Sequence, residues 1–229
     1  MHDRVLEVLE QCRYVVLTDG DDLDQVYRLR YDCYRAEKSI PANQRRIMSD
    51  RFDTTPNCVH VAIEMDGALV SAVRLHLVSK LMLRSPTLEV FPEFLDSPDF
   101  GNTLLDPTRF VVHPDARKTR SPLHLLTLRI PFLATMFYDV ETALAPVRAE
   151  HAAFYVQFLE YDHWADPRPY PGLRKPVALL TAKVKEHRDA VLAKYPFFGH
   201  VDSIPQSEID FPDLKGVYAP GESSVPIVA

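Results

Sequence analysis

The sequence LLDPTRFVVHPDARKTRSPLH, at residues 104–124, decides the fold of this 229-residue chain. An apolar, strand-like run ends at His113, and a basic cluster follows at residues 117–120. Ser121 and Pro122 then begin a long apolar helix. A strand, a basic turn and a helix N-terminus together are typical of a phosphate-binding site, because backbone N–H groups face the anion there. Turns that hold a pyrophosphate usually carry glycine, and this turn has none.

The hydrophobic patterns on both sides of this stretch predict alternating helices and strands. The predicted helices cover residues 4–12, 23–37, 122–137, 148–161 and 184–195, the second of them capped by Asp22. The predicted strands cover residues 13–18, 58–65, 68–78, 108–113, 141–147 and 175–184. The turn Asp66-Gly67 joins two of these strands as a hairpin. Strands connected both by a hairpin and by helices predict a mixed sheet with helices on both faces.

Composition limits the classes of function. The net charge is −6, whereas proteins that bind duplex nucleic acid are usually basic, so we expect no nucleic-acid partner. No apolar run approaches the ~18 residues of a membrane span, and the N-terminus is too acidic for a signal peptide. Three scattered cysteines fit a reducing cytoplasm, and together with nine histidines they form no metal-binding spacing. We therefore expect a cytoplasmic protein without a metal or a tightly bound cofactor.

The C-terminal part of the chain differs from the rest in composition. The chain has 19 prolines, and the region from residue 196 onward is rich in them. Such a region favours an extended arm over a packed element. We expect a single domain over residues 1–195 and a Pro-rich tail over residues 196–229.

Several stretches resemble the acyl-homoserine-lactone synthases and the long-chain N-acyl amino acid synthases. VYRLRYDCY at residues 26–34 and SDRFD at residues 49–53 are similar to the first-helix and Asp-x-Tyr-Asp motifs of the lactone synthases. LVSAVRL at residues 69–75 and LDPTRFVV at residues 105–112 are similar to two of their strand motifs. Residues 147–180 resemble the N-acyl amino acid synthases, in which a helix with a His and a Phe-Tyr pair precedes an Arg-x-Tyr-Pro turn.

The resemblance implies the GNAT acyltransferase fold, an α/β (α+β) architecture with a mostly antiparallel central sheet. It implies an N-acyltransferase that moves a fatty acyl group from acyl-carrier protein, a phosphopantetheine thioester, to the amine of an amino acid. The alternatives are an autoinducer synthase that uses S-adenosylmethionine, a CoA-dependent N-acetyltransferase that takes acyl-CoA, and a catalytically silent carrier-binding module. Asp106 stands where these families usually have Glu, and Met48 stands where the lactone synthases have an acid, which disfavours S-adenosylmethionine. The turn without glycine disfavours CoA.

Attack of an amine on a thioester needs a proton acceptor, donors for the oxyanion and a proton for the thiolate, without a covalent enzyme intermediate. Asp106 is the candidate base, and the alternative is a structural capping role. Tyr155 is the candidate donor to the thiolate, and the alternative is core packing. Arg109 is the third candidate catalytic residue.

The remaining candidates bind the two substrates. Arginines on apolar elements are seldom buried without a partner, so they either form an internal ion-pair network or bind the acceptor's carboxylate. The candidate acceptor-binding residues are Arg30, Asp50, Asp53 and Arg74. The resemblance implies that the backbone at Phe110 and Val111 pairs with the pantetheine arm. A single phosphate and an acidic carrier surface would meet Arg117, Lys118 and Arg120.

Overall fold

The computed structural model describes residues 1–18, 20–118, 121–214 and 216–217. Its strands form one sheet in the order β1-β2-β3-β4-β5-β7-β6. Their bounds are β1 Arg13–Leu17, β2 Cys58–Met65, β3 Ala68–Ser79, β4 Thr103–Val112, β5 Thr142–Val147, β6 Asp162–Arg168 and β7 Val177–Lys183. β4 and β5 are parallel, and the other neighbours are antiparallel. The predicted mixed, mostly antiparallel sheet is confirmed.

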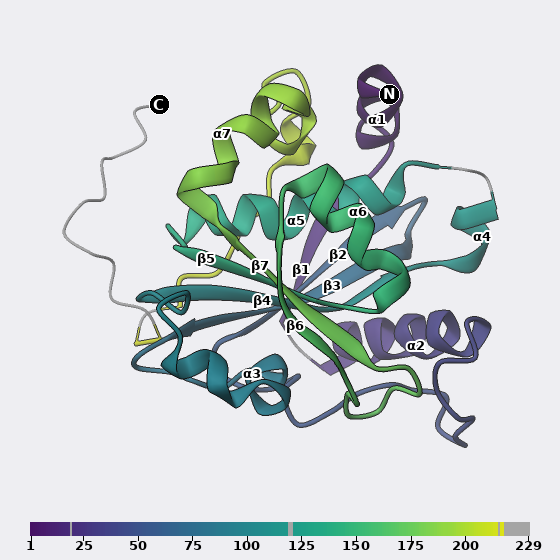
Figure 1. Cartoon of the computed structure of the whole chain (residues 1–229). Helices are drawn as coiled ribbons and strands as arrows, with labels where there is room; N and C mark the ends of the chain where they lie inside the picture. The colour runs from purple at the N-terminus through teal and green to yellow at the C-terminus, as the bar shows by residue number, and fades with distance from the viewer. Residues whose placement is uncertain (19, 119–120, 215, 218–229) are drawn as a thin grey trace.

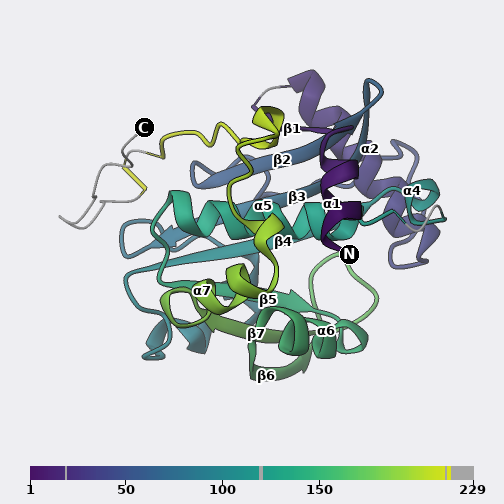
Figure 2. The same cartoon turned by 90° about the horizontal axis from the view of Figure 1, so that it is seen from above.

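Helices cover both faces of this sheet. The longer helices are α1 His2–Leu9, α2 Gly20–Ala36, α5 Leu123–Phe137, α6 Ala149–Leu159 and α7 Val184–Lys194. Two short helices, α3 Pro86–Val90 and α4 Pro114–Lys118, lie on either side of β4 in the sequence. Figure 1 shows α2 and α3 on one face, and Figure 2 shows α1, α5, α6 and α7 on the other. None of the helices in the described residues has the length and apolarity to cross a membrane.

The hairpin of β2 and β3 agrees with its prediction. Asp66 has φ 50° and Gly67 has φ 77°, so both turn residues lie in the left-handed region. Two-residue hairpins favour such turns because their twist matches that of the strands. The ladder runs from Cys58 paired with His76 to Met65 paired with Ala68.

Several elements differ from the predictions, among them α1, which covers His2–Leu9, and the short helices α3 and α4, which were not predicted. α2 begins at Gly20, so Asp22 lies inside the helix and does not cap it. β4 begins at Thr103, five residues before the predicted start, because its first residues pair with β3. β6 was not predicted, because its residues are mostly exposed or half-buried and show no apolar alternation. It lies at the sheet edge, where Pro167 removes no bond from a central ladder.

The segment after α7 does not leave the domain at residue 195. Phe197, Phe198, Ile204 and Phe211 are buried in the same core cluster as α5. The fully buried Arg129 on α5 donates hydrogen bonds of 2.7–2.8 Å to the carbonyl groups of Phe197, Gly199 and Ser207. The segment up to Phe211 is thus part of the core, because its aromatic residues bury apolar surface despite the proline content. Residues 218–229 of the expected tail lie outside the described residues.

Candidate active site

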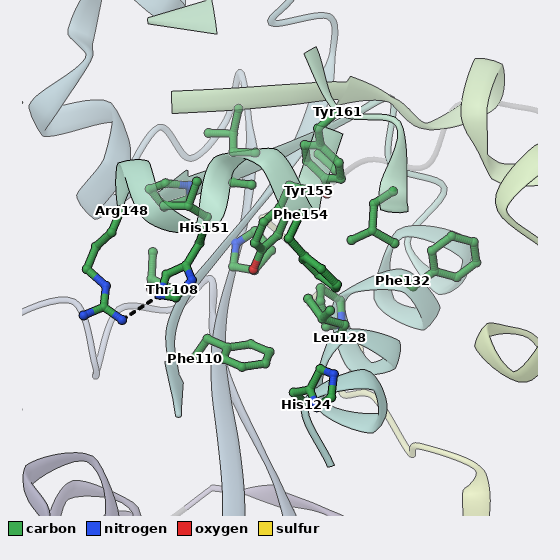
Figure 3. Close-up of a pocket in the computed structure, with 18 of the residues that line it drawn as sticks. Thr108, Phe110, His124, Leu128, Phe132, Arg148, His151, Phe154, Tyr155 and Tyr161 are labelled. Carbon is green, nitrogen blue, oxygen red and sulfur yellow. Dashed lines mark hydrogen bonds between the residues drawn. The ribbon is translucent and has the colours of Figure 1, made fainter. Parts of the chain in front are cut away.

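A cavity of about 770 Å³ lies where β4 and β5 separate. The two strands pair only at Leu104 with Thr142 and at Leu105 with Ala143, and no further ladder joins them. One end of the cavity, here called the polar end, is lined by Tyr34, Glu37, Arg109, Arg117, Arg148 and Tyr170. Another part, here called the apolar end, is lined mainly by apolar side chains of α5, α6 and α7, including Leu128, Phe132, Phe154, Leu159, Val184 and Val191, while His124, His187 and Arg188 of the same helices also line the cavity. Figure 3 shows Leu128 of α5 beside Phe154 of α6 in this part of the cavity.

A β-bulge gives Arg109 its position beside this cavity. Ala72 pairs with Val111 and Arg74 pairs with Thr108, so Val73 alone faces both Arg109 and Phe110. Arg109 has φ 54°, a conformation that non-glycine residues seldom adopt. Bulges redirect side chains, and they are frequent next to active sites. As a result, the consecutive side chains of Thr108 and Arg109 both reach the α2 face of the sheet.

On that face, five side chains form a network that we call the charged cluster: Arg30, Asp50, Asp53, Arg74 and Arg109. Asp53 Oδ1 accepts hydrogen bonds of 2.7 Å from Arg30 Nη1 and from Arg74 Nη1. Asp50 accepts a bond of 2.7 Å from Arg74 Nη1 and one of 2.6 Å from Arg109 Nη2. Burial raises the pKa of Asp50, but Arg74 and Arg109 outweigh it, so the pKa lies well below its usual range.

Only one arginine of the charged cluster reaches the cavity. Arg30 and Arg74 are fully buried, and both are bonded to Asp53. Arg109 is 8% exposed and lines the polar end. Both alternatives for the arginines are therefore compatible with the geometry: Arg30 and Arg74 belong to an internal ion-pair network, while Arg109 has access to a ligand.

Two histidines on the same face are held neutral. His60 Nδ1 accepts a 2.8 Å hydrogen bond from Arg30 Nη2, and its Nε2–H donates to the carbonyl oxygen of Asp53. Burial, assisted by Arg30, lowers the pKa of His60 to about 4. Burial and the charge of Arg74 lower the pKa of His76 to about 3. Both imidazoles therefore pack as neutral polar groups at pH 7.

Asp106 does not line the cavity. It is fully buried on the α2 face, where Oδ2 accepts a 2.5 Å hydrogen bond from the Ser85 hydroxyl and Oδ1 accepts one of 2.7 Å from the Thr87 hydroxyl. Burial raises the pKa of this carboxyl, and the hydroxyl bonds offset only part of the effect. Ser85 also caps α3 through Leu88 N–H. The role of Asp106 as a base stays a prediction, and this enclosure favours the alternative of a structural carboxyl.

Tyr155 lies on α6 and lines the cavity. Figure 3 shows it turned into the cavity on the side of Phe110, beside Phe154 and Tyr161. Its ring packs edge-on against those of Phe154 and Tyr161, with distances of 5.7 and 5.8 Å between the ring centroids. Burial raises the pKa of the phenol, so it stays protonated at neutral pH. Its access to the cavity is compatible with a role as proton donor to the thiolate, and its ring contacts are compatible with core packing.

Only some of the predicted donor-binding residues lie at the cavity. Phe110 and Arg117 line the cavity, whereas Val111 and Lys118 do not. Arg117 forms an ion pair with Glu37, and the exposed Lys118 pairs with Asp115 at 2.7 Å. Arg120 lies outside the described residues.

Two tyrosines at the polar end were not among the predicted site residues. Tyr34 is the last residue of the VYRLRYDCY stretch, and Tyr170 belongs to the Arg-x-Tyr-Pro turn. Both motifs were visible in the sequence, but neither pattern indicated which side chain would point toward Arg109. Arg148 and His151 also line the cavity, and Arg148 Nη2 donates a 2.7 Å hydrogen bond to His151 Nε2 (Figure 3).

Comparison with known proteins agrees with this architecture. The solved structure of FeeM, an N-acyl amino acid synthase from uncultured soil microbes, superposes with a TM-score of 0.64 at 15% identity, covering 80% of this chain and 96% of that one. A CoA-dependent acyl-homoserine lactone synthase, BjaI, gives 0.60 at 14% identity, covering 86% and 98%. An acyl-CoA N-acyltransferase from Pseudomonas aeruginosa gives 0.51 at 16% identity, covering 74% and 98%. These likenesses confirm a GNAT-like fold.

The sequence itself identifies the family. A search of the curated proteins finds no match. The family model for the N-acyl amino acid synthase FeeM matches residues 25–183, which run from α2 to the end of β7 and include the charged cluster and most of the cavity. The chain therefore belongs to the FeeM family of N-acyl amino acid synthases and is an acyltransferase.

Proposed function

We propose that the enzyme transfers a fatty acyl group from the phosphopantetheine thioester of acyl-carrier protein to the amine of an amino acid. The observation that carries this proposal is the cavity between β4 and β5, which is polar at one end and apolar at the other. An acyl chain buries its methylene groups in the apolar end at about 0.8 kcal/mol for each CH₂. The polar end receives the amino acid, so the two reactants meet beside Thr108 and Phe110.

The donor arm lies along the unpaired edge of β4. Beyond Leu105 this edge makes no ladder with β5, so the backbone groups on the segment containing Phe110 are available to pantetheine. The arm enters beside Arg117, which lines the cavity and has a side chain that is 44% exposed. One guanidinium and the N-terminus of α5 suit a single phosphate, because a turn without glycine does not close around two. We therefore favour the carrier protein over CoA as the donor.

The amine attacks the thioester carbonyl directly. The N–C bond forms, the C–S bond breaks, and the phenol of Tyr155 gives its proton to the departing thiolate. Within the described residues, the carboxylate that lines the cavity is Glu37, which is paired with Arg117 and Arg148. His151 offers no lone pair at Nε2, because Arg148 donates to it. A water molecule at the open polar end therefore accepts the amine proton.

Product analysis by mass spectrometry tests the proposal. The protein is incubated with one long-chain acyl group presented on acyl-carrier protein or on CoA, together with the twenty amino acids and S-adenosylmethionine. We expect N-acyl amino acids, formed fastest from the carrier protein. Product from acetyl-CoA alone would contradict the proposed donor, and acyl-homoserine lactone would show the acceptor to be S-adenosylmethionine. Tight carrier binding without any product would indicate a silent module.

A further inference from the structure

The polar end of the cavity contains hydrogen-bonding groups that the described residues do not satisfy. Arg109 Nη2 donates to Asp50, and its other guanidinium N–H groups make no hydrogen bond to another described residue. The buried Tyr170 hydroxyl lies near Thr87 and Asp106 but makes no hydrogen bond of normal length within the described part of the chain, and its residue lines the cavity. Buried polar groups in native proteins are nearly always bonded, so an unpartnered group beside a cavity indicates a ligand.

Three distant parts of the sequence bring these groups together. Arg109 comes from the bulge in β4, Tyr34 from the last turns of α2, and Tyr170 from the loop between β6 and β7. Burial lowers the pKa of Arg109, but the proximity of Tyr34, Asp50 and Tyr170 outweighs burial, and the pKa is raised. The phenols of Tyr34 and Tyr170 thus lie near the guanidinium, and all three side chains line the same cavity.

The charge balance of this region favours an anion. The charged cluster contains three guanidinium groups, on Arg30, Arg74 and Arg109, but only the two carboxylates of Asp50 and Asp53. The nearby carboxyl of Asp106 is directed at Ser85 and Thr87 and makes no ion pair within the described residues. A buried, unbalanced charge is unfavourable, and the unbalanced charge borders the cavity at Arg109.

We propose that Arg109, Tyr34 and Tyr170 bind the α-carboxylate of the acceptor, so that the enzyme selects α-amino acids over amines that lack a carboxylate. This inference rests on the proposed function and adds the group by which the acceptor is recognised. The planar guanidinium is suited to a carboxylate, and the two phenols donate to its remaining lone pairs. The α-amine, one carbon away, then faces Thr108 and the separated strands.

The test compares an amino acid with its own primary amide. The best acceptor from the product screen is used, because the amide keeps the same amine and side chain but carries no negative charge. The wild-type enzyme should have a higher kcat/KM for the acid. Arg109→Gln should reduce this preference by roughly 10- to 100-fold, as expected for bonds to a charged group. Tyr170→Phe and Tyr34→Phe should each reduce it several-fold, mainly through KM.

Stability measurements separate recognition from folding. Tyr170→Phe removes a hydroxyl that makes no hydrogen bond of normal length to the described residues, so its unfolding midpoint should be equal to that of the wild type or higher. Tyr195→Phe is the matched control, because this ring stacks on Phe158 and does not line the cavity. Equal use of acid and amide by the wild type would overturn the inference, and so would equal losses for both acceptors in the Arg109 and Tyr170 variants.

The inference and the proposed function can fail separately. If no donor gives an N-acyl product, the proposed function fails, and titration calorimetry with the twenty amino acids and matched amides still tests the carboxylate site. Binding of an acid that is lost in Arg109→Gln, without binding of its amide, would support the site. Absence of binding for every acid would overturn it.

Discussion

The two faces of β4 have different surroundings. On the α2 face, the strand contributes Asp106, Thr108 and Arg109 to a buried region dense with charge and hydrogen bonds. On the α5 face, Pro107 and Phe110 border an open cavity whose far end is apolar. Directional hydrogen bonds therefore hold the side chains of the charged face in place, while the apolar face leaves room for a substrate. Arg109 is the residue that connects the two.

The largest effect should come from the centre of the charged face. Arg74→Met leaves Asp53 buried beside Arg30 alone and removes one partner of Asp50. Breaking a buried ion-pair network in this way should cost about 3–5 kcal/mol of unfolding free energy. Urea unfolding followed by circular dichroism measures it.

An exposed pair provides the control for Arg74. Arg13 pairs with Glu64 in solvent, so Arg13→Met should leave the unfolding midpoint unchanged within error. If Arg13→Met lowered the unfolding free energy as much as Arg74→Met, burial would not explain the contribution of the charged cluster to stability.

On the cavity side, Tyr155→Phe should reduce kcat and leave folding intact. The variant keeps the ring contacts with Phe154 and Tyr161 but has no proton for the thiolate. We expect a loss in kcat of about 100-fold, the lower range for removal of a general acid. Single-turnover kinetics with acyl-carrier protein measures it, with Tyr195→Phe as control. Unchanged kcat would leave Tyr155 a packing residue.

The charged face should also respond to acid through its histidines. His60 and His76 have folded-state pKa values of about 4 and about 3, below the unfolded value of 6.5. The unfolded chain therefore takes up protons first, and stability is lost as the pH falls below about 6.5. At pH 5 the loss should be on the order of 2 kcal/mol for each histidine relative to pH 7.

Urea unfolding at pH 7 and pH 5 tests this dependence. His60→Gln should show a smaller difference between the two pH values than the wild type. Replacing the exposed His163 with Gln provides the control and should preserve the wild-type difference. A difference that is the same in all three proteins would exclude His60 as its source.

A variant of Asp106 tests whether this residue on the α2 face takes part in the reaction in the cavity. Asp106→Asn keeps one acceptor for Ser85 or Thr87, so we expect a loss of about 1 kcal/mol in unfolding free energy. If Asp106 is structural, kcat should fall less than tenfold. A loss in kcat of about 100-fold or more at unchanged stability would show that Asp106 is the base after all, acting at a distance.

The smallest effect should be at the cavity mouth. Arg117→Ala removes a half-exposed cation that is already paired with Glu37, so binding of acyl-carrier protein should weaken by less than about tenfold, and less at high salt. Lys118→Ala is the matched control, because Lys118 is exposed on the same helix but does not line the cavity. If both variants weakened carrier binding equally, α4 would contribute only its overall positive charge and not a specific contact from Arg117.

The sequence by itself determined most of the longer elements and the family. Alternation around Asp66-Gly67 predicted the hairpin, and the apolar run at residues 122–137 predicted α5, because both patterns depend on local periodicity. The motifs that carry Arg30, Asp50, Asp53 and Arg74 indicated either an ion-pair network or an acceptor-binding site, since buried arginines require partners.

Only the tertiary structure decided which of these residues meet the cavity. Asp106 and Arg109 lie three residues apart on one strand, yet the bulge turns Arg109 to the cavity while Asp106 is enclosed by Ser85 and Thr87. Tyr34 and Tyr170 join Arg109 from helices and loops far away in the sequence. A bulge, and a meeting of distant side chains, depend on how the whole sheet pairs, and no local pattern in the chain encodes that.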